Sequence, residues 1–190
     1  MSNQKLVILD IDETLIHATK NPPYENWDFE LFDFKVFIRP FLAEFLIFLK
    51  DHFKIGVWSS ASDDYVEAIS NIIFPLDYPL QFIWGRQKCT YKLDYNKVDD
   101  SGYLDYYEHY NYVKQLSKVK KQFKIPLETI LIIDDSPHKC IQNYGNAIYP
   151  NPFEGDEEDD ELLRLQKYLL KLKDVDNVRE IEKRFWHSEV

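Results

Sequence analysis

The sequence has few cysteines, and this shortage excludes a fold stabilised by disulfide bonds. The two that are present, Cys89 and Cys140, are too few for a disulfide framework and form no CxxC pattern. We interpret both as ordinary thiols of a reducing compartment. Long apolar runs are also missing, since no stretch approaches the roughly 20 residues of a membrane span. The first ten residues lack the features of a secretory signal, so we expect a soluble, intracellular protein, cytoplasmic or nuclear, with no membrane partner.

Positive charge is scarce as well. The chain has 23 Lys and Arg against 33 Asp and Glu, which gives a formal net charge of −10. Seven of the acids lie in the eight residues EGDEEDDE, 154–161. This balance argues against nucleic acid as a partner, because such binding depends on basic surface. We interpret the acidic run as a solvated loop that leads into the first turn of a helix.

Short apolar runs recur along the chain, and three of them end abruptly at a polar residue. Residues 6–9, 55–58 and 130–133 are followed by Asp10, by Ser59 and by Asp134. Four apolar residues in a row are typical of strands that are buried on both faces of a parallel sheet. Weaker strand candidates are found at 34–38, 80–84 and 146–149.

Helical patterns alternate with these strands. They cover 40–53, 62–74, 110–123, 136–145, 160–172 and roughly 176–186. The alternation predicts an α/β fold, a three-layer sandwich around a central, mainly parallel sheet. Length and composition predict a single domain over 1–190, with a small irregular or β-structured insertion at about 85–109 and no large cap.

Acidic residues gather where such a sheet binds its ligands, beyond the carboxyl ends of the strands. The acids are Asp10, Asp12, Asp134 and Asp135. Four carboxylates in one pocket repel each other, and Mg²⁺ is the hard cation that would relieve this repulsion. Together with the Ser59 hydroxyl and Lys114, expected in the first turn of its helix, the ion would hold a phosphoryl group.

The two acids of DIDET, residues 10–14, can divide the chemistry of phosphate removal. One carboxylate attacks phosphorus and forms an aspartyl-phosphate. The other gives a proton to the leaving oxygen and later takes one from the hydrolytic water. Each residue alone has a simpler explanation as a turn, a cap or a surface charge. The combination at three strand ends favours a catalytic site.

The segment LDIDETLIHA, residues 9–18, resembles the first motif of the haloacid dehalogenase superfamily. It is closest to the branch of small C-terminal-domain phosphatases, which includes the NLI-interacting-factor-like proteins. The resemblance continues in GRQKC at 85–89, YNYVKQLS at 110–117 and ILIIDDSP at 130–137, and covers about residues 5 to 183. It implies a HAD-like Rossmannoid fold and phosphatase activity on phosphoserines of proteins such as the RNA polymerase II tail.

The resemblance also implies roles for individual residues. Asp10 would be the nucleophile and Asp12 the general acid and base, while Lys114 orients Asp10 and the phosphate. The substrate side would include Thr14, which supports the loop, Ser59, which holds phosphoryl oxygens, and Arg86. The Mg²⁺ ligands would be Asp10, Asp134, Asp135 and the backbone carbonyl of Asp12.

The sequence thus predicts a monomeric Mg²⁺-dependent phosphomonoester hydrolase that acts on phosphoserine or phosphothreonine in a protein or peptide. A site without a large cap favours a macromolecular substrate, because small-molecule phosphatases usually need a lid. Two alternatives stay open. One is a small-molecule phosphatase of the same superfamily. The other is a non-catalytic module that binds phosphoprotein or resembles a signalling receiver, although a receiver carries its acid pair on the first strand.

Overall fold

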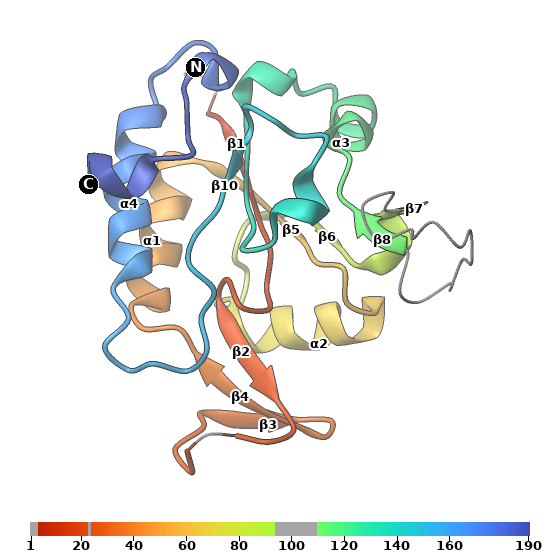
Figure 1. The fold of residues 1–190 in the computed structure, drawn as a ribbon, viewed down its shortest axis with the longest axis vertical. Coiled ribbons are helices and arrows are strands. Elements are labelled where there is room, and N and C mark those ends of the chain that lie inside the picture. The colour runs from red at the N-terminus through yellow and green to blue at the C-terminus, as the bar shows by residue number, and fades with distance from the viewer. Residues whose placement is uncertain (1–3, 23, 94–109) are drawn as a thin grey trace, which may run out of the picture.

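A five-stranded sheet lies at the centre of the structure, and all of its strands run parallel (Figure 1). The computed structural model describes residues 4–22, 24–93 and 110–190. The order β10-β9-β1-β5-β6 puts the first strand of the chain in the middle, which confirms the predicted α/β fold. The strands are β1 (Leu6–Leu9), β5 (Lys54–Trp58), β6 (Leu80–Trp84), β9 (Ile130–Ile133) and β10 (Ala147–Ile148).

The register of the central strands decides where the polar residues after them meet. Leu9, the last residue of β1, pairs with Val57 on one side and with Ile133 on the other. The three strands therefore end at nearly the same level. The polar residues that follow them are brought to one edge of the sheet.

Helices cover both faces of this sheet and complete the three predicted layers. Along β1, Val7 and Leu9 belong to one core and Leu6 and Ile8 to the other, and all four are fully buried. This explains why the strand is apolar without alternation. The first core packs under α1 (Leu42–His52), α2 (Asp63–Ile73) and α4 (Glu161–Leu172), and the second under α3 (Leu116–Phe123).

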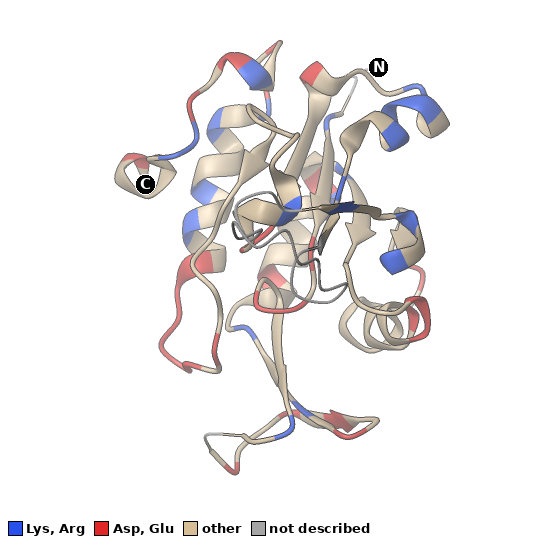
Figure 2. Ribbon diagram, turned by 45° about the vertical axis from the view of Figure 1, so that its right-hand side comes forward, with Lys and Arg blue, Asp and Glu red and all other residues tan. Residues whose placement is uncertain are grey.

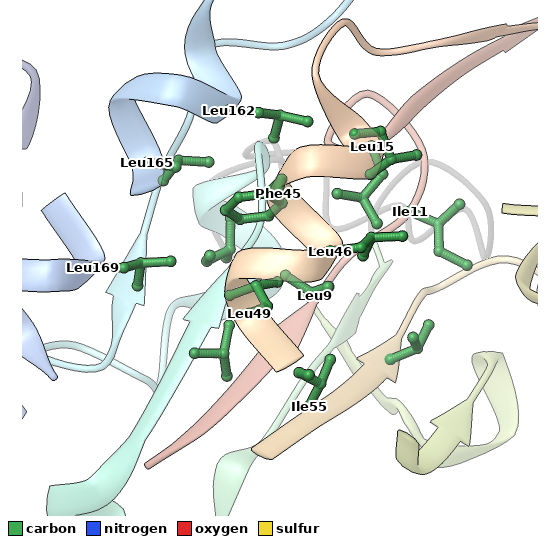
Figure 3. Packing of buried hydrophobic residues seen from close by; sticks show 14 of the residues in the cluster. Leu9, Ile11, Leu15, Phe45, Leu46, Leu49, Ile55, Leu162, Leu165 and Leu169 are labelled. Carbon is green, nitrogen blue, oxygen red and sulfur yellow. The ribbon is translucent and has the colours of Figure 1, made fainter. Parts of the chain in front are cut away.

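The helix α1 packs between the sheet and α4 (Figure 3). Its Phe45, Leu46 and Leu49 are buried in the same cluster as Leu9 and Ile55 of the sheet. The matching face of α4 repeats at helical spacing, with Leu162, Leu165 and Leu169. Burial of each such side chain contributes about 1.5–3 kcal/mol, so this layer holds β1 firmly in place.

Two small antiparallel sheets are added to the central one. The first has the order β2-β4-β3 and extends away from the central sheet in Figure 1. Its strands are β2 (Ile16–Thr19), β3 (Phe29–Leu31) and β4 (Phe34–Ile38). Residues 34–38 were predicted as a strand, but they pair here with two short strands that the sequence did not reveal. The second sheet joins β7 (Thr90–Leu93) to β8 (Tyr110–Val113), and the rest of the predicted insertion, 94–109, lies outside the described residues.

Three predicted helices differ from the structure. The helix predicted over 110–123 begins only at Leu116, because 110–113 pair with β7. The helix predicted over 136–145 is a single 3₁₀ turn, Pro137–Cys140, since the buried Asn143 side chain bonds the main chain of residues 114 and 116. The last predicted helix is two 3₁₀ turns, Val178–Glu180 and Trp186–Glu189. Lys183 lies between these turns and donates to three main-chain carbonyl oxygens, which holds the chain out of a helix.

The acidic run lines the loop that enters α4, where it is red in Figure 2. It is not wholly the solvated loop that the sequence predicted. Asp159 accepts two hydrogen bonds of 2.8 Å from Arg39, whose side chain is fully buried. Arg39 also donates to the Thr14 carbonyl at 3.0 Å, so this part of the run braces the loop after β1. No helix in the described part of the chain has the length and apolar character needed to cross a membrane.

Candidate active site

The loop after β1 begins with Asp10, which the sheet itself fixes. The Asp10 amide donates to the Ile133 carbonyl of β9 at 2.9 Å, so the parallel pairing continues one residue past the strand. Immediately afterwards the chain turns, with Leu15 N–H donating to the Ile11 carbonyl at 2.8 Å and Glu13 in the left-handed region at φ 56°. Ile11 and Leu15 are fully buried and anchor this turn in the core.

The Asp10 carboxylate is fully buried between two lysines. Its Oδ1 lies 2.9 Å from the Lys114 Nζ and accepts a 2.9 Å hydrogen bond from the Ile11 amide. Its Oδ2 lies 3.3 Å from the Lys139 Nζ. Burial raises the pKa of Asp10, but Lys114 and Lys139 outweigh it and hold the pKa below its usual range. Asp10 is therefore ionised, as a nucleophile has to be.

The Asp12 carboxylate has neutral partners instead. Its Oδ1 accepts a 2.7 Å hydrogen bond from the Tyr65 hydroxyl of α2, and its Oδ2 lies 3.5 Å from the Ser59 Oγ. Burial raises the pKa of Asp12, the Tyr65 bond opposes this rise, and the charge of Asp10 adds to it. Asp12 therefore holds a proton more readily than an ordinary aspartate, which suits a general acid.

The acid pair after β9 lies beside Asp10. The Asp134 Oδ2 lies 2.6 Å from the Lys114 Nζ, so this buried lysine bridges the ends of β1 and β9. Burial lowers the pKa of Lys114, but Asp10 and Asp134 together raise it above its ordinary value. Asp135 accepts a 2.9 Å hydrogen bond on Oδ2 from the Ser136 hydroxyl.

Three of these carboxylates could share a metal ion. Asp10, Asp134 and Asp135 each offer an oxygen, and these atoms lie within 4.8 Å of one another. The Asp135 Oδ1 is buried and has no hydrogen-bond partner among the described residues. Carboxylate oxygens are the ligands that Mg²⁺ prefers, and the Asp135 Oδ1 has no other partner among the described residues, so the three acids fit this ion. The Asp12 side chain is not in this group, so the role predicted for its backbone carbonyl stays a prediction.

The other predicted residues lie around this cluster. Ser59 follows β5, its amide donates to the Trp84 carbonyl at 2.9 Å, and its Oγ accepts from the Ala61 amide at 3.0 Å. Thr14 is fully buried, and its hydroxyl accepts a 3.3 Å bond from the Asp135 amide. The structure thus gives Thr14 a bracing position behind the acids rather than one on an open surface.

Arg86 lies at the edge of the site. Its Nε donates to the Ser60 carbonyl at 2.9 Å, and its guanidinium lies 5.1 Å from the ring centre of Tyr112. With Asp12, Tyr65 and the aromatic rings of Phe32 and Phe34, it lines a cavity of about 480 Å³. The cavity gives a bound group access to Asp12 from the solvent side.

Lys114 occupies the predicted site but not the predicted element. It lies between β8 and α3, not in the first turn of a helix. Its amide donates to the Lys139 carbonyl at 2.8 Å, and its carbonyl accepts from the Asn143 side chain. The short connection between β8 and α3 thus points the lysine under β1 and β9.

Two residues of the site were missed by the sequence analysis. Lys139 fell within the helix predicted over 136–145 and Tyr65 within that predicted over 62–74, and neither was given a role in the site. A cation four residues after Asp135 was the available signal for Lys139. For Tyr65 the sequence carries no signal, because its helical position does not tell which group the hydroxyl reaches.

The structure combines a parallel α/β sheet with acid pairs at two adjacent strand ends, and a buried lysine bridges these pairs. This arrangement is typical of the haloacid dehalogenase superfamily. Within it, the chain belongs to the NLI interacting factor-like phosphatase family, whose model matches residues 5–179.

Individual relatives agree with this assignment. The chain is 29% identical over 183 residues to CTD small phosphatase-like protein 2 of Dictyostelium discoideum. The aligned region covers 91% of this chain and 28% of that longer protein. It is 29% identical over 193 residues to CTD phosphatase-like protein 355R of Invertebrate iridescent virus 3, covering 88% of this chain and 96% of the viral one.

A solved structure shares the fold. The structure of Fcp1, an essential RNA polymerase II CTD phosphatase, is similar with a TM-score of 0.63 at 19% identity. The similarity covers 90% of this chain and 62% of that one. At this identity the likeness shows the fold alone.

Proposed function

We propose that the protein is a Mg²⁺-dependent phosphomonoester hydrolase that acts through an aspartyl-phosphate on Asp10. We further propose that its substrate is phosphoserine or phosphothreonine in a protein. One observation carries the proposal: two carboxyl groups in one loop have opposite environments. Asp10 lies between two ammonium groups, and Asp12 is bonded to a tyrosine hydroxyl.

The reaction follows from these environments. An Asp10 oxygen attacks phosphorus while the bond from phosphorus to the leaving oxygen breaks, and Asp12 gives its proton to that oxygen. Asp12 then takes a proton from a water molecule, which attacks phosphorus and releases Asp10 and inorganic phosphate. Lys114 and the Ser59 hydroxyl hold phosphoryl oxygens in both steps.

The proposed metal site uses this chain's acids. Asp10, Asp134 and Asp135 would hold Mg²⁺, with the backbone carbonyl of Asp12 as a further ligand. When bound, the ion supplies positive charge against the phosphoryl oxygens. The proximity of the three carboxylates and the unpaired Asp135 Oδ1 support this site.

Two observations support a protein substrate. The cavity beside Asp12 has apolar walls, and one of them, Phe32, is 65% exposed, so a side chain presented by a larger molecule has apolar surface to contact. The relatives and the structural neighbour carry the names of CTD phosphatases. Because the chain spans 28% of the Dictyostelium relative, the activity of that whole protein comes here only as a proposal. We also propose that the protein is intracellular and monomeric. Light scattering of the purified protein would test the monomeric state.

Hydrolysis of p-nitrophenyl phosphate tests the chemistry. We expect turnover with Mg²⁺ and its loss in EDTA, with recovery when Mg²⁺ is added in excess. Absence of turnover over a range of pH and metals would favour a non-catalytic phosphoprotein-binding module.

A substrate panel tests the class of substrate. Phosphopeptides, including RNA polymerase II tail repeats, would be compared with sugar phosphates and nucleotides by kcat/KM. We expect the phosphopeptides to be preferred. A clear preference for the small compounds would replace the proposal by a small-molecule phosphatase.

A further inference from the structure

Lys139 reaches into the acid cluster from a turn that is fixed at both sides. It lies in the 3₁₀ turn Pro137–Cys140, and its amide donates to the Ser136 carbonyl at 3.0 Å. Its carbonyl accepts from the Lys114 amide at 2.8 Å. The backbone of Lys139 is therefore fixed, and only its side chain is free to change position.

The side chain of Lys139 covers one oxygen of the nucleophile. Its Nζ lies 3.3 Å from the Asp10 Oδ2, and its side chain is 17% exposed. The other oxygen, Oδ1, already has the Ile11 amide and Lys114 as partners. Both oxygens of Asp10 are thus in contact with an ammonium group, one buried and one with a path to solvent.

The Lys139 ammonium and a divalent ion need the same carboxylates. The charge of Lys139 interacts with Asp10, Asp134 and Asp135, the three residues whose oxygens lie within 4.8 Å of one another. A divalent ion in contact with Asp10 and Asp135 would lie within a few ångströms of this ammonium, and like charges at that distance repel strongly. Lys114 has no exposed side and cannot give way.

We propose that Lys139 is a built-in counter-cation of the acid cluster, which competes with Mg²⁺ for the Asp10 Oδ2 and withdraws toward solvent when the ion binds. This inference rests on the proposed magnesium site. A flexible four-carbon stem with a single point charge suits such an exchange. The lysine neutralises the cluster when no ion is bound and weakens the binding of the ion.

Calorimetric titration of the full chain with MgCl₂, after removal of metal with EDTA, tests the proposal without measuring activity. Lys139→Met keeps an unbranched, flexible side chain, shorter by its last atom, and removes the charge. We expect it to bind Mg²⁺ on the order of tenfold more tightly than the wild type. Lys139→Arg keeps the charge and should bind like the wild type. Lys121→Met removes an exposed lysine of α3 and is the matched control.

Thermal unfolding gives a second readout. In EDTA, Lys139→Met should melt at a lower temperature than the wild type, because the acids lose a counter-charge. Excess Mg²⁺ should raise its melting temperature more than that of the wild type. Should Lys139→Met not fold, Lys139→Gln removes the charge while keeping a donor for Asp10 and carries the same test.

The outcomes separate this inference from the proposed function. Equal or weaker Mg²⁺ binding by the uncharged variants would overturn the competition. A raised KM with unchanged Mg²⁺ affinity would also overturn it, since Lys139 would then be a phosphoryl ligand. Mg²⁺ binding by Lys139→Met, with no binding by the wild type, would mean that Lys139 excludes the ion completely and would support the proposal. Absence of binding by all variants would overturn the magnesium site itself, and the inference with it.

Discussion

The site has two halves that treat the same residue type in opposite ways. The charged half, formed after β1 and β9, contains Asp10, Asp134 and two lysines, and its acids are fully buried. The neutral half, beside β5 and α2, contains Asp12 with hydroxyl groups of Tyr65 and Ser59. The pKa of Asp10 lies below its ordinary value and that of Asp12 above it, although the two are two residues apart. Burial raises the pKa of both carboxyl groups, and the two lysines beside Asp10, which have no counterpart at Asp12, make the difference between them.

The largest expected effect comes from changing the charged half at Asp10, the proposed nucleophile. We expect Asp10→Asn to lower kcat by at least about a thousandfold, because the amide is a poor nucleophile. Hydrolysis of p-nitrophenyl phosphate measures the loss, and circular dichroism checks that the variant is folded. Turnover close to that of the wild type would exclude Asp10 as the residue that bonds to phosphorus.

The next effect concerns stability. Lys114→Met would leave Asp10 and Asp134 facing each other in a buried place with Lys139 as their remaining cation. We expect a loss of about 3–5 kcal/mol in the free energy of unfolding, the usual cost of breaking a buried ion pair. Urea unfolding measures it. Lys118→Met is the control, because among the described residues this lysine donates to the Lys88 carbonyl at the surface and not to a buried acid. A similar loss in both variants would contradict the special position of Lys114.

A smaller effect is expected in the neutral half. Ser59→Ala removes a hydroxyl that we propose to bond a phosphoryl oxygen, and loss of one such donor typically costs roughly 100- to 1,000-fold in kcat. The unfolding free energy should change little, since Ala61 is half-buried and water can replace the hydroxyl as the partner of its amide. Steady-state kinetics with a phosphopeptide measure the effect. An unchanged kcat/KM would remove Ser59 from the substrate site.

The charged half was largely predictable from the sequence, because its acids directly follow strands that can be recognised from short stretches of sequence. Leu6 to Leu9 form an unbroken apolar run only because both faces of β1 are covered, and such strands end at one edge of a parallel sheet. This places Asp10 beside Asp134 without knowledge of any contact. Lys114 was already a candidate for a fixed positive charge, and the resemblance to the family then implied its role beside Asp10, although its helix was predicted to start too early.

The remaining residues depend on contacts between distant parts of the chain. Lys139 reaches Asp10 only because 136–145 is not a helix, and the amide of Asn143 decides this by bonding the main chain near α3. The short strand β2 is held by its pairing with residues 35–38. Its own four residues mix polar and apolar side chains, so the sequence shows no strand pattern there. The helix that carries Tyr65 was predicted, but a helical pattern does not show that the Tyr65 hydroxyl meets Asp12.

The smallest expected effect changes the pKa of Asp12 in the neutral half and leaves the charged half as it is. The Tyr65 hydroxyl bonds the Asp12 carboxylate and so opposes the rise of its pKa, which burial drives. Removing it in Tyr65→Phe raises the pKa of Asp12 further. The protonated form of Asp12, which we propose to act first as an acid, then persists to higher pH. The alkaline limb of the kcat/KM profile should therefore move to higher pH, with only a few-fold change at the optimum. The control is Tyr78→Phe, which removes a hydroxyl that bonds the Leu46 carbonyl instead and should leave the limb in place. A limb that stays fixed in Tyr65→Phe, or moves to lower pH, would show that this titration does not belong to Asp12.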